Sequence, residues 1–450
     1  MRFTLIFFFF TQLVIAQDIS GTILDSETNE PIENVTVYFE KDNIGTVSDA
    51  SGTFSLKLSS KFTKTDTLQF SLIGYHSKMI AVTTFTKINN TIYLSKKLES
   101  LDQVVVNSSK KLNARINFKT LKSLKTGVSA FGSQVVGNYI YVISGNSSYI
   151  EDSGKRALMA VNNLPEATLG DLIKELRQNF SFEDYTDKLQ IYDIQDNSWS
   201  VAETTFRKRA YHNLNCYGNE LYSLGGKRLS VNRKKEYLDD KIEVYDMNSK
   251  QIIIDHTNPH QAVNFTSLTY HDNIIVMGGS TSKKEKGKKV YSDVSHIYNI
   301  TSGNWYELPK MKTAKETQGV IIDNTIYLIG GYNEKALKDI ESYNITTGTW
   351  NTEGELFYEM ERPALAVHEH TIYMFNDGKL LTYDTTTDLL EAYKINLDLE
   401  HPKMHYHQNK LYIIGGYLLN DYSKAASSNL YVINLDEFDK TKPISSNKID

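Results

Sequence analysis

The chain has 450 residues, of which 40% are hydrophobic and 23% charged, and its formal net charge is -5. This length allows two or three domains, and the acidic balance argues against a general nucleic-acid binder. The single cysteine, Cys216, excludes an intrachain disulfide and the structural zinc sites that need several cysteines. We expect Cys216 to be a small buried apolar residue.

Residues 1–16 have the pattern of a secretory signal peptide. Arg2 supplies a positive charge, Leu5 to Ile15 form an apolar core, and Val14 and Ala16 fit a small-residue cleavage site. The apolar run is too short to span a membrane with ordinary flanks, and no later segment reaches about 18 apolar residues. We therefore expect an exported protein with no transmembrane segment after cleavage.

Residues 18–106 alternate apolar and polar side chains between turn signals, which predicts a small antiparallel β-sandwich. The motifs Gly21 to Asp25, Glu30 to Ile32, Gly45 to Phe54 and Ile73 to Tyr75 resemble the carboxypeptidase-regulatory-like domain, a transthyretin-like sandwich. The resemblance implies a non-catalytic accessory module. It also implies a Gram-negative setting, either the periplasm, the outer-membrane surface or the cell exterior.

One phrase recurs six times between residues 127 and 439: a tight turn, then an apolar strand that usually ends in paired glycines. It reads NYIYVISG from Asn138, NELYSLGG from Asn219, NIIVMGG from Asn273, NTIYLIGG from Asn324, HTIYMFND from His370 and NKLYIIGG from Asn409. A third strand ends in an aromatic residue and Asp or Asn, and Trp199, Trp305 and Trp350 mark fourth strands. Four strands in a period of about 50 residues are typical of kelch repeats.

The region resembles kelch-repeat proteins, and its six repeats imply a six-bladed propeller over residues 127–439. The predicted fold class is therefore all-β, with a small antiparallel β-sandwich followed by a six-bladed kelch-type β-propeller. Glycine pairs would end inner strands where no Cβ fits, and Tyr and Trp would fill the wedges between blades. Residues 107–126 are predicted to be a linker, although Ile116 to Leu121 could close the ring, and 440–450 a C-terminal tail.

Three loops expected on one face of such a propeller carry excess positive charge. The balance is +2 over residues 202–210, +2 over 227–240 and +3 over 280–293. This indicates either a docking surface for an anionic partner, such as an acidic glycan or a phosphate-bearing polymer, or simply solvated loops. The candidate ligand-binding residues are Arg207, Lys208, Arg209, Lys227, Arg228, Arg233, Lys283, Lys284, Lys286, Lys288 and Lys289.

An insertion in the first repeat, residues 146–187, contains a predicted helix with Thr168 and Asp171 as an N-cap pair. It would be a lid or partner-binding helix, or a cover for a strand edge. Its apolar residues at helical spacing are Leu169, Leu172, Ile173, Leu176 and Phe180.

Two further groups of polar residues are candidates for metal binding or for acid–base chemistry. The histidine pairs His368 with His370 and His405 with His407 lack an identifiable third ligand, so we predict no metal and no cofactor. Kelch enzymes place acid–base groups where first strands begin near the axis. The residues expected there are Glu316, Glu361, Arg362 and His405.

Three functions stay open, because propellers host many activities. We favour a non-catalytic exported module of the bacterial envelope or exterior that binds protein or glycan, including anionic partners, through propeller loops. The alternative is a mutarotase- or epimerase-like kelch enzyme acting on an acidic sugar such as N-acetylneuraminate, which needs only an acid and a base. The third is an oxidase similar to galactose oxidase, whose copper ligands we cannot assign although Cys216 is available for a crosslink.

Overall fold

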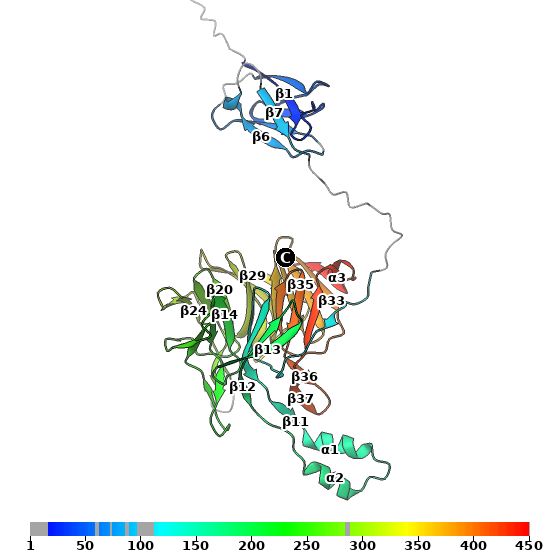
Figure 1. The fold of residues 1–450 in the computed structure, drawn as a ribbon, viewed down its shortest axis with the longest axis vertical. Coiled ribbons are helices and arrows are strands. Elements are labelled where there is room, and N and C mark those ends of the chain that lie inside the picture. Colours follow the sequence, from blue (N-terminus) through cyan, green and yellow to red (C-terminus); the bar gives the residue numbers. More distant parts are fainter. Residues whose placement is uncertain are drawn as a thin grey trace, which may run out of the picture. The chain divides into compact units, whose positions relative to one another are not determined.

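The computed structural model describes residues 17–58, 63–72, 74–85, 90–96, 112–283 and 289–449. The predicted signal peptide lies outside these residues, as do Lys284, Lys286 and Lys288 of the candidate binding loop. The chain divides into two compact units, Met1–Lys110 and Lys111–Asp450, and both are built from β-sheets (Figure 1). In the described ranges, helices are too short or too polar to cross a bilayer.

The first unit has two sheets that share one apolar core. Its strands are β1 (Gln17–Asp25), β2 (Thr36–Phe39), β3 (Ile44–Val47), β4 (Thr53–Leu58), β5 (Thr67–Ser71), β6 (Lys78–Ala81) and β7 (Asn90–Leu94), with 3-10 turns at Glu40–Asp42 and Val82–Thr84. The strand orders are β4-β1-β7 and β3-β2-β5-β6. Along β4 the buried residues Phe54, Leu56 and Leu58 alternate with exposed ones, so that one face packs on the core.

The prediction of wholly antiparallel pairing in this unit is wrong at one edge. β1 pairs with β4 antiparallel but with β7 parallel. A parallel pair needs a long crossover, and the chain between β1 and β7 supplies it by forming the second sheet.

In the described part of the second unit, six sheets of four or five strands follow one another along the chain. Their orders are β9-β10-β12-β13, β14-β15-β18-β19, β20-β21-β24-β25, β26-β27-β28-β29, β30-β31-β32-β33-β39 and β34-β35-β38-β8. The bounds are β8 Lys119–Thr120, β9 Gly132–Val136, β10 Tyr139–Asn146, β12 Tyr185–Asp193, β13 Ser198–Thr205, β14 Asn213–Tyr217, β15 Glu220–Leu224, β18 Ile242–Asp246, β19 Ile252–Asp255, β20 Thr266–Tyr270, β21 Asn273–Met277, β24 Ser295–Asn299, β25 Asn304–Leu308, β26 Glu316–Ile322, β27 Thr325–Asn333, β28 Lys335–Asn344, β29 Thr349–Glu355, β30 Ala364–His368, β31 Thr371–Asn376, β32 Lys379–Asp384, β33 Leu389–Lys394, β34 Lys403–His407, β35 Lys410–Ile414, β38 Leu430–Asn434 and β39 Ser445–Lys448.

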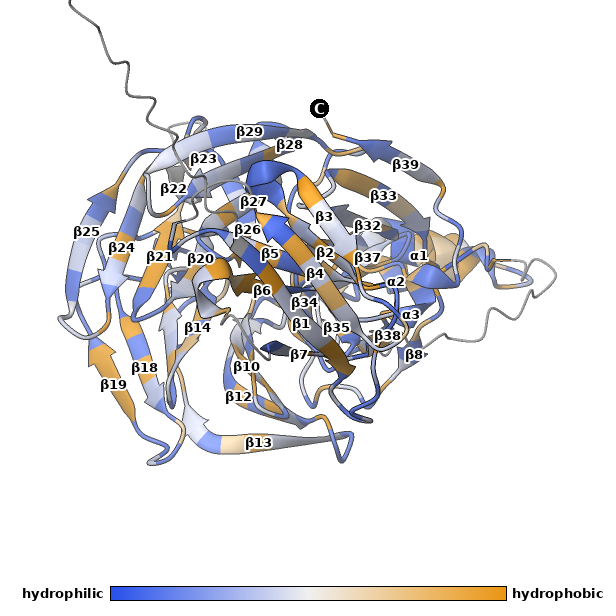
Figure 2. Ribbon diagram, turned by 90° about the horizontal axis from the view of Figure 1, so that it is seen from above, coloured by the Kyte–Doolittle hydropathy of each residue, from blue (hydrophilic) through white to orange (hydrophobic). Residues whose placement is uncertain are grey.

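The first strands of these sheets contact one another around a centre. β9 contacts β14, β14 contacts β20, and the series continues through β26, β30 and β34 back to β9. Viewed from above, β14 and β20 lie inside the outer strands β19 and β25 (Figure 2). The residues at the start of each first strand are thereby brought together.

The repeated glycines and aromatics explain how neighbouring sheets fit together. Gly225 has a positive φ of 70°, and a Cβ there would lie 2.4 Å from the Phe265 ring of the next sheet. A side chain is therefore excluded both by conformation and by space. Each tryptophan packs against the tyrosine of its neighbouring third strand, with ring centroids 5.0 Å apart for Trp199 and Tyr192.

Residues 112–126, which we expected to be linker, belong to the second unit. Ile116 is buried, and its amide donates to the Lys394 carbonyl. β8 pairs with β38 and supplies the strand that the sixth repeat lacks, within the stretch from Ile116 to Leu121. The expected C-terminal tail contains β39, which pairs with β33. Both ends of the repeat region are therefore held by sheet hydrogen bonds.

Smaller elements extend from the loops. The hairpins are β16 (Lys227–Leu229) with β17 (Glu236–Leu238), and β22 (Ser280–Lys283) with β23 (Lys289–Tyr291). A third sheet joins β11 (Tyr149–Glu151), β36 (Tyr417–Leu419) and β37 (Ser423–Ala426). The helices are α1 (Ser153–Asn162), α2 (Leu169–Leu176) and α3 (Asp436–Asp439).

The segment between the two units should be the first site of proteolysis. Lys110 and Lys111 lie at the division between the units, in a polar stretch of sequence, and such segments are poorly protected. Brief trypsin digestion should release the second unit with an N-terminus at Lys111 or Leu112, measured by intact-mass spectrometry. First cleavage at a lysine or arginine inside one of the six sheets would contradict this expectation.

Candidate functional site

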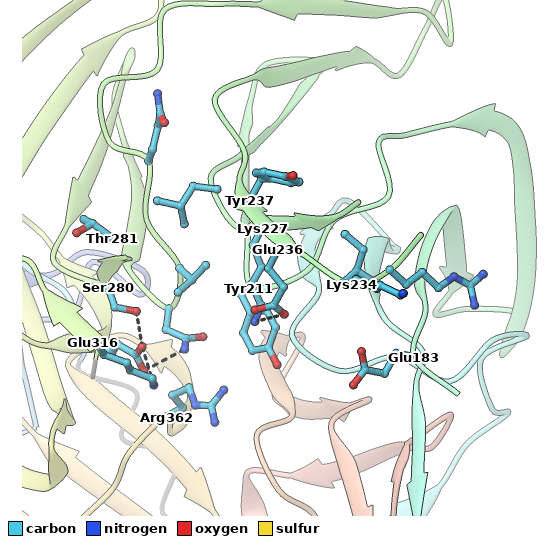
Figure 3. Close-up of a pocket in the computed structure, with 17 residues that line it drawn as sticks. Glu183, Tyr211, Lys227, Lys234, Glu236, Tyr237, Ser280, Thr281, Glu316 and Arg362 are labelled. Carbon is cyan, nitrogen blue, oxygen red and sulfur yellow. Dashed lines mark hydrogen bonds and ion pairs between the residues drawn. The ribbon is translucent and has the colours of Figure 1, made fainter. Parts of the chain in front are cut away.

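A cavity of about 1050 Å³ opens among the loops of the second unit. It lies between the hairpins β16–β17 and β22–β23, the residues that precede the first strands β20 and β30, and the start of β26. Glu316, Ser280 and Arg362 lie on one side of it, and Tyr211 and Glu236 lie across from them (Figure 3). Its lining combines aromatic, aliphatic and charged side chains, as ligand-binding cavities usually do.

Glu316 is the most deeply placed acid in this cavity. It is fully buried and accepts hydrogen bonds from Ser280 Oγ at 2.6 Å and Asn264 Nδ2 at 3.0 Å, and it pairs with Lys289 Nζ at 2.9 Å. These three donors occupy both oxygens, so Glu316 links neighbouring sheets. A carboxylate engaged in this way is a poor candidate for a free catalytic acid or base.

Beneath the cavity lies a smaller space of about 40 Å³, which we call the central recess. It shares Tyr211, Asn264 and Arg362 with the cavity above. All six sheets contribute to it through residues at or just before their first strands. The polar lining residues are Tyr211, His212, Asn213, Asn264, Gln318, Arg362, His401 and Lys403.

Lys403 and two histidines in or beside the central recess have lowered pKa values. Burial is the largest cause, and it lowers the pKa of Lys403 to about 8, with a further contribution from Arg362. Burial and then Lys403 lower the pKa of His405 to about 4. Burial and then the cations Arg362 and Lys424 lower the pKa of His401 to about 2. Burial therefore favours the neutral forms of all three groups, although Lys403, with a pKa of about 8, stays protonated at pH 7.

Two of the three candidate basic residues of the first loop, Arg207 and Arg209, lie in a buried ion network. Arg209 is fully buried and pairs with Glu243 at 2.5 Å and Asp239 at 3.4 Å. Arg207 also pairs with Asp239, with its Nε at 3.1 Å. The assignment of Arg209 to a ligand-binding surface is therefore wrong, because no ligand can reach it. Its acidic partners come from the neighbouring loop and from β18.

Most of the other candidate cations also have acidic partners within the chain. Lys227 pairs with Glu236 at 2.6 Å, Arg228 with Asp239 at 3.4 Å, and Lys208 and Arg233 with Asp184 at 3.7 and 3.5 Å. Lys289 pairs with Glu316 as described above. Of the remaining four, Lys283 lies in β22, and the others fall outside the described residues. The structure brings Lys227, Arg233 and Lys289 together around one cavity, but with their counter-charges.

The histidine pairs are engaged in separate contacts. His405 Nε2 lies 2.8 Å from Ser133 Oγ, and His407 Nε2 lies 3.1 Å from Asn138 Oδ1. The His368 ring stacks on Tyr406. Among the residues that the structure describes, no three His, Cys, Asp or Glu side chains cluster as metal ligands do. Cys216 is half-buried, and burial raises its pKa.

The predicted helix of the insertion is confirmed as α2. Thr168 and Asp171 form the expected capping box. The helix packs against α1, and the pair projects away from the sheets in Figure 1, so it does not cover a strand edge. α1 was missed because its sequence has weak apolar periodicity and only Ala157 is buried among its residues.

Only some residues of the central recess were predicted from the sequence. Arg362 was singled out, but Tyr211, His401 and Lys403 were not. Tyr211, Arg362 and His401 each lie two residues before a first strand, and Lys403 begins the first strand β34. Aligning the repeats on that position would have identified them.

Two families match the chain. Residues 19–106 match the CarboxypepD_reg-like domain, and residues 178–378 match the KLHDC2/KLHL20/DRC7 Kelch-repeats domain. The solved structure of YjhT, a β-propeller, aligns with a TM-score of 0.51 at 11% identity, covering 70% of this chain and 97% of that one. At this identity the likeness establishes the fold only.

Curated relatives match the repeat region. Kelch-like protein 40 of Xenopus laevis is 26% identical over 208 residues, which is 46% of this chain and 32% of that protein. Kelch repeat and BTB domain-containing protein 2 of cowpox virus is 28% identical over 148 residues, 32% of this chain and 26% of that protein. The matches span about a third or less of these relatives. Residues 178–378 therefore carry kelch repeats, and residues 19–106 carry a carboxypeptidase-regulatory-like domain.

Proposed function

We propose that the protein is an exported, non-catalytic binding module of the bacterial envelope or exterior, recognising a protein or glycan partner through the loop face of its second unit. In this proposal the six sheets are the blades of one closed propeller, and the first unit is an accessory β-sandwich. Export is proposed from the signal-like pattern of residues 1–16. The kelch domain is consistent with binding, because such domains generally mediate contacts with other proteins.

The observation that carries the proposal is the large cavity between the loop hairpins. Its mixed lining, with Tyr211 and Tyr237 beside charged groups, suits an amphipathic partner. Lys227 lies 4.5 Å from the centre of the Tyr211 ring, which fixes the ring in the cavity wall. The saturated contacts of Glu316 favour binding over acid–base catalysis, so we do not propose the mutarotase-like activity.

A binding screen with the mature full-length chain tests this function. We expect binding to at least one protein or polymer of the bacterial envelope, and we expect Tyr237→Ala to weaken it about tenfold, since aromatic anchors dominate interfaces. Val231→Ala is the matched control, because Val231 lies in the same loop and is fully exposed. No binding across an envelope protein and glycan panel, or equal affinity for both variants, would contradict the proposal.

The lysine loop gives a second test, for an anionic partner. Replacing Lys283, Lys284, Lys286 and Lys288 by Ser should weaken the binding of such a partner and flatten its salt dependence, because salt screens attraction between opposite charges, with a Debye length of about 8 Å at physiological ionic strength. The melting temperature should hardly change. Lys440→Ser with Lys442→Ser, on the exposed terminal segment, is the control. Unchanged affinity in the loop variant would show that these lysines are only solvated.

A further inference from the structure

We propose that the central recess binds one carboxylate group of the ligand, held by Arg362 and Lys403, while the rest of the ligand occupies the cavity above. The inference rests on the proposed function, because it assigns the chemistry of one end of that ligand. The recess and the cavity share Tyr211, Asn264 and Arg362, so a single ligand can enter both.

The charge around the recess favours an anion. Among the described residues, its lining contains two cations, Arg362 and Lys403, and no Asp or Glu. Every neighbouring charge that affects the pKa of Lys403, His405 or His401 is positive. Burying like charges together is costly unless an opposite charge compensates them. Among the described residues, Lys403 has no acidic partner, whereas the loop cations are compensated by Asp184, Asp239 and Glu316.

The two cations retain hydrogen-bonding capacity. Among the described residues, the Lys403 ammonium has one hydrogen-bond partner, Gln318 Oε1 at 3.3 Å, although an ammonium has three donors. Arg362 directs its Nε and one Nη toward a single oxygen of Glu361, at 3.1 and 3.0 Å. In the described part of the chain its other Nη group has no partner, so that group can bind a ligand. A guanidinium and an ammonium together match the two oxygens of a carboxylate.

The size of the recess selects among anions. One water molecule needs roughly 10–15 Å³ of volume open to a water-sized sphere. The recess, at about 40 Å³, therefore holds about three atoms of the size of a water oxygen. A carboxylate has three heavy atoms, whereas a sulfate or phosphate group has five. The recess therefore fits a carboxylate and is too small for the larger tetrahedral anions.

An NMR titration of the mature full-length chain tests the inference with small probes. N-acetylglycine carries the carboxylate of a peptide end and glucuronate that of a sugar ring, and N-acetylglycinamide and glucose are their neutral counterparts. We expect at least one acid to bind, with a dissociation constant at least tenfold lower than that of its neutral counterpart and of inorganic sulfate. The acid that binds more tightly identifies the source of the carboxylate.

Variants locate the binding. Arg362→Gln and Lys403→Met should each raise the dissociation constant about tenfold or more, while Lys403→Arg should restore much of the affinity. Lys394→Met, at an exposed lysine of β33, is the matched control. Glu361→Gln should tighten binding, because it removes the carboxylate that competes for Arg362. Tryptophan fluorescence checks that each variant is folded.

The inference is overturned if neither acid binds, if sulfate binds as tightly as the acids, or if Lys403→Met binds as tightly as Lys394→Met. These results are separable from the failure of the proposed function. A macromolecular partner found without any carboxylate binding refutes the recess assignment alone. Carboxylate binding that depends on Arg362 and Lys403, without any macromolecular partner, refutes the binding-module function alone.

Discussion

Replacing Arg209 by Met is expected to lower the free energy of unfolding of the second unit by about 3–5 kcal/mol, the usual cost of removing one partner from a buried ion pair. Arg209 is fully buried, and its guanidinium contacts Glu243 and Asp239. It also donates to the carbonyl oxygens of Ser223 and Lys241. Methionine fills similar space but leaves Glu243 buried without its cation.

Urea unfolding followed by tryptophan fluorescence measures this loss in the full chain. Trp199, Trp305 and Trp350 all lie in the second unit, so the signal reports that unit alone. Lys208→Met is the matched control, because the Lys208 side chain is 55% exposed and pairs loosely with Asp184. The control should cost less than about 1 kcal/mol. Similar losses for both variants would show that the Arg209 network does not stabilise the unit.

The same buried contact recurs in other repeats. Lys315, fully buried, pairs with Glu341 of β28 at 2.6 Å, and His260 meets His296 of β24 with their Nδ1 atoms 3.1 Å apart. Glu243, His296 and Glu341 occupy the same place in their third strands. Each pair ties the segment before a first strand to the third strand of the same sheet. In these three repeats the two segments are thus joined at the same position, by an ion pair in two of them and by a histidine pair in the third.

The strands and sheets could be predicted because their signals are local. Alternation of apolar and polar residues, the turn before each second strand and the glycine pairs all lie within about ten residues of sequence. The strand that completes the sixth sheet was also identifiable, since Ile116 to Leu121 is the apolar stretch left over before the first repeat. The parallel pairing of β1 with β7 was not, because it depends on the path of the whole intervening chain.

The candidate site could not be predicted to the same extent, because charge compensation is not local. Counting charges within each loop gave three basic loops. Asp184, which pairs with Lys208 and Arg233, lies in the insertion of the first repeat, outside every loop that was counted. Glu243, which pairs with Arg209, lies in β18. Among the described residues, Lys403 has no acidic partner and Arg362 has only Glu361, and these two cations, far apart in sequence, line one recess only when the first strands converge.

Acid should destabilise the second unit through His260. This residue is only 4% exposed, and burial is the main cause that lowers its pKa from 6.5 to about 4. The unfolded chain takes up the proton at about pH 6.5, whereas the folded chain takes it up at about pH 4. Between these values the unfolded state binds more protons, so stability falls as the pH falls through this window. The difference between the two pKa values corresponds to a loss of roughly 3 kcal/mol in the free energy of unfolding once the pH lies below both.

The contacts of His260 explain why the folded state resists protonation. Its Nε2 lies 2.9 Å from the Gly278 carbonyl oxygen and donates to it, so its Nδ1 accepts from Nδ1 of His296. A protonated His260 would place two N–H groups against each other. His296 is itself held toward its neutral form, because burial lowers its pKa. Protonation therefore requires this contact to break within a buried part of the sheet.

Unfolding titrations at pH 7 and pH 4.5 test this account with the parent chain, His260→Gln and His256→Gln. Glutamine cannot titrate in this range. Between pH 7 and pH 4.5 the free energy of unfolding of His260→Gln should therefore fall by about 2 kcal/mol less than that of the parent. It should be less stable than the parent at pH 7, because the contact with His296 is altered. His256 is exposed and serves as the control, whose loss should equal that of the parent. If His260→Gln keeps the full pH dependence of the parent, acid destabilisation of this unit arises elsewhere, with His405 as the next residue to substitute.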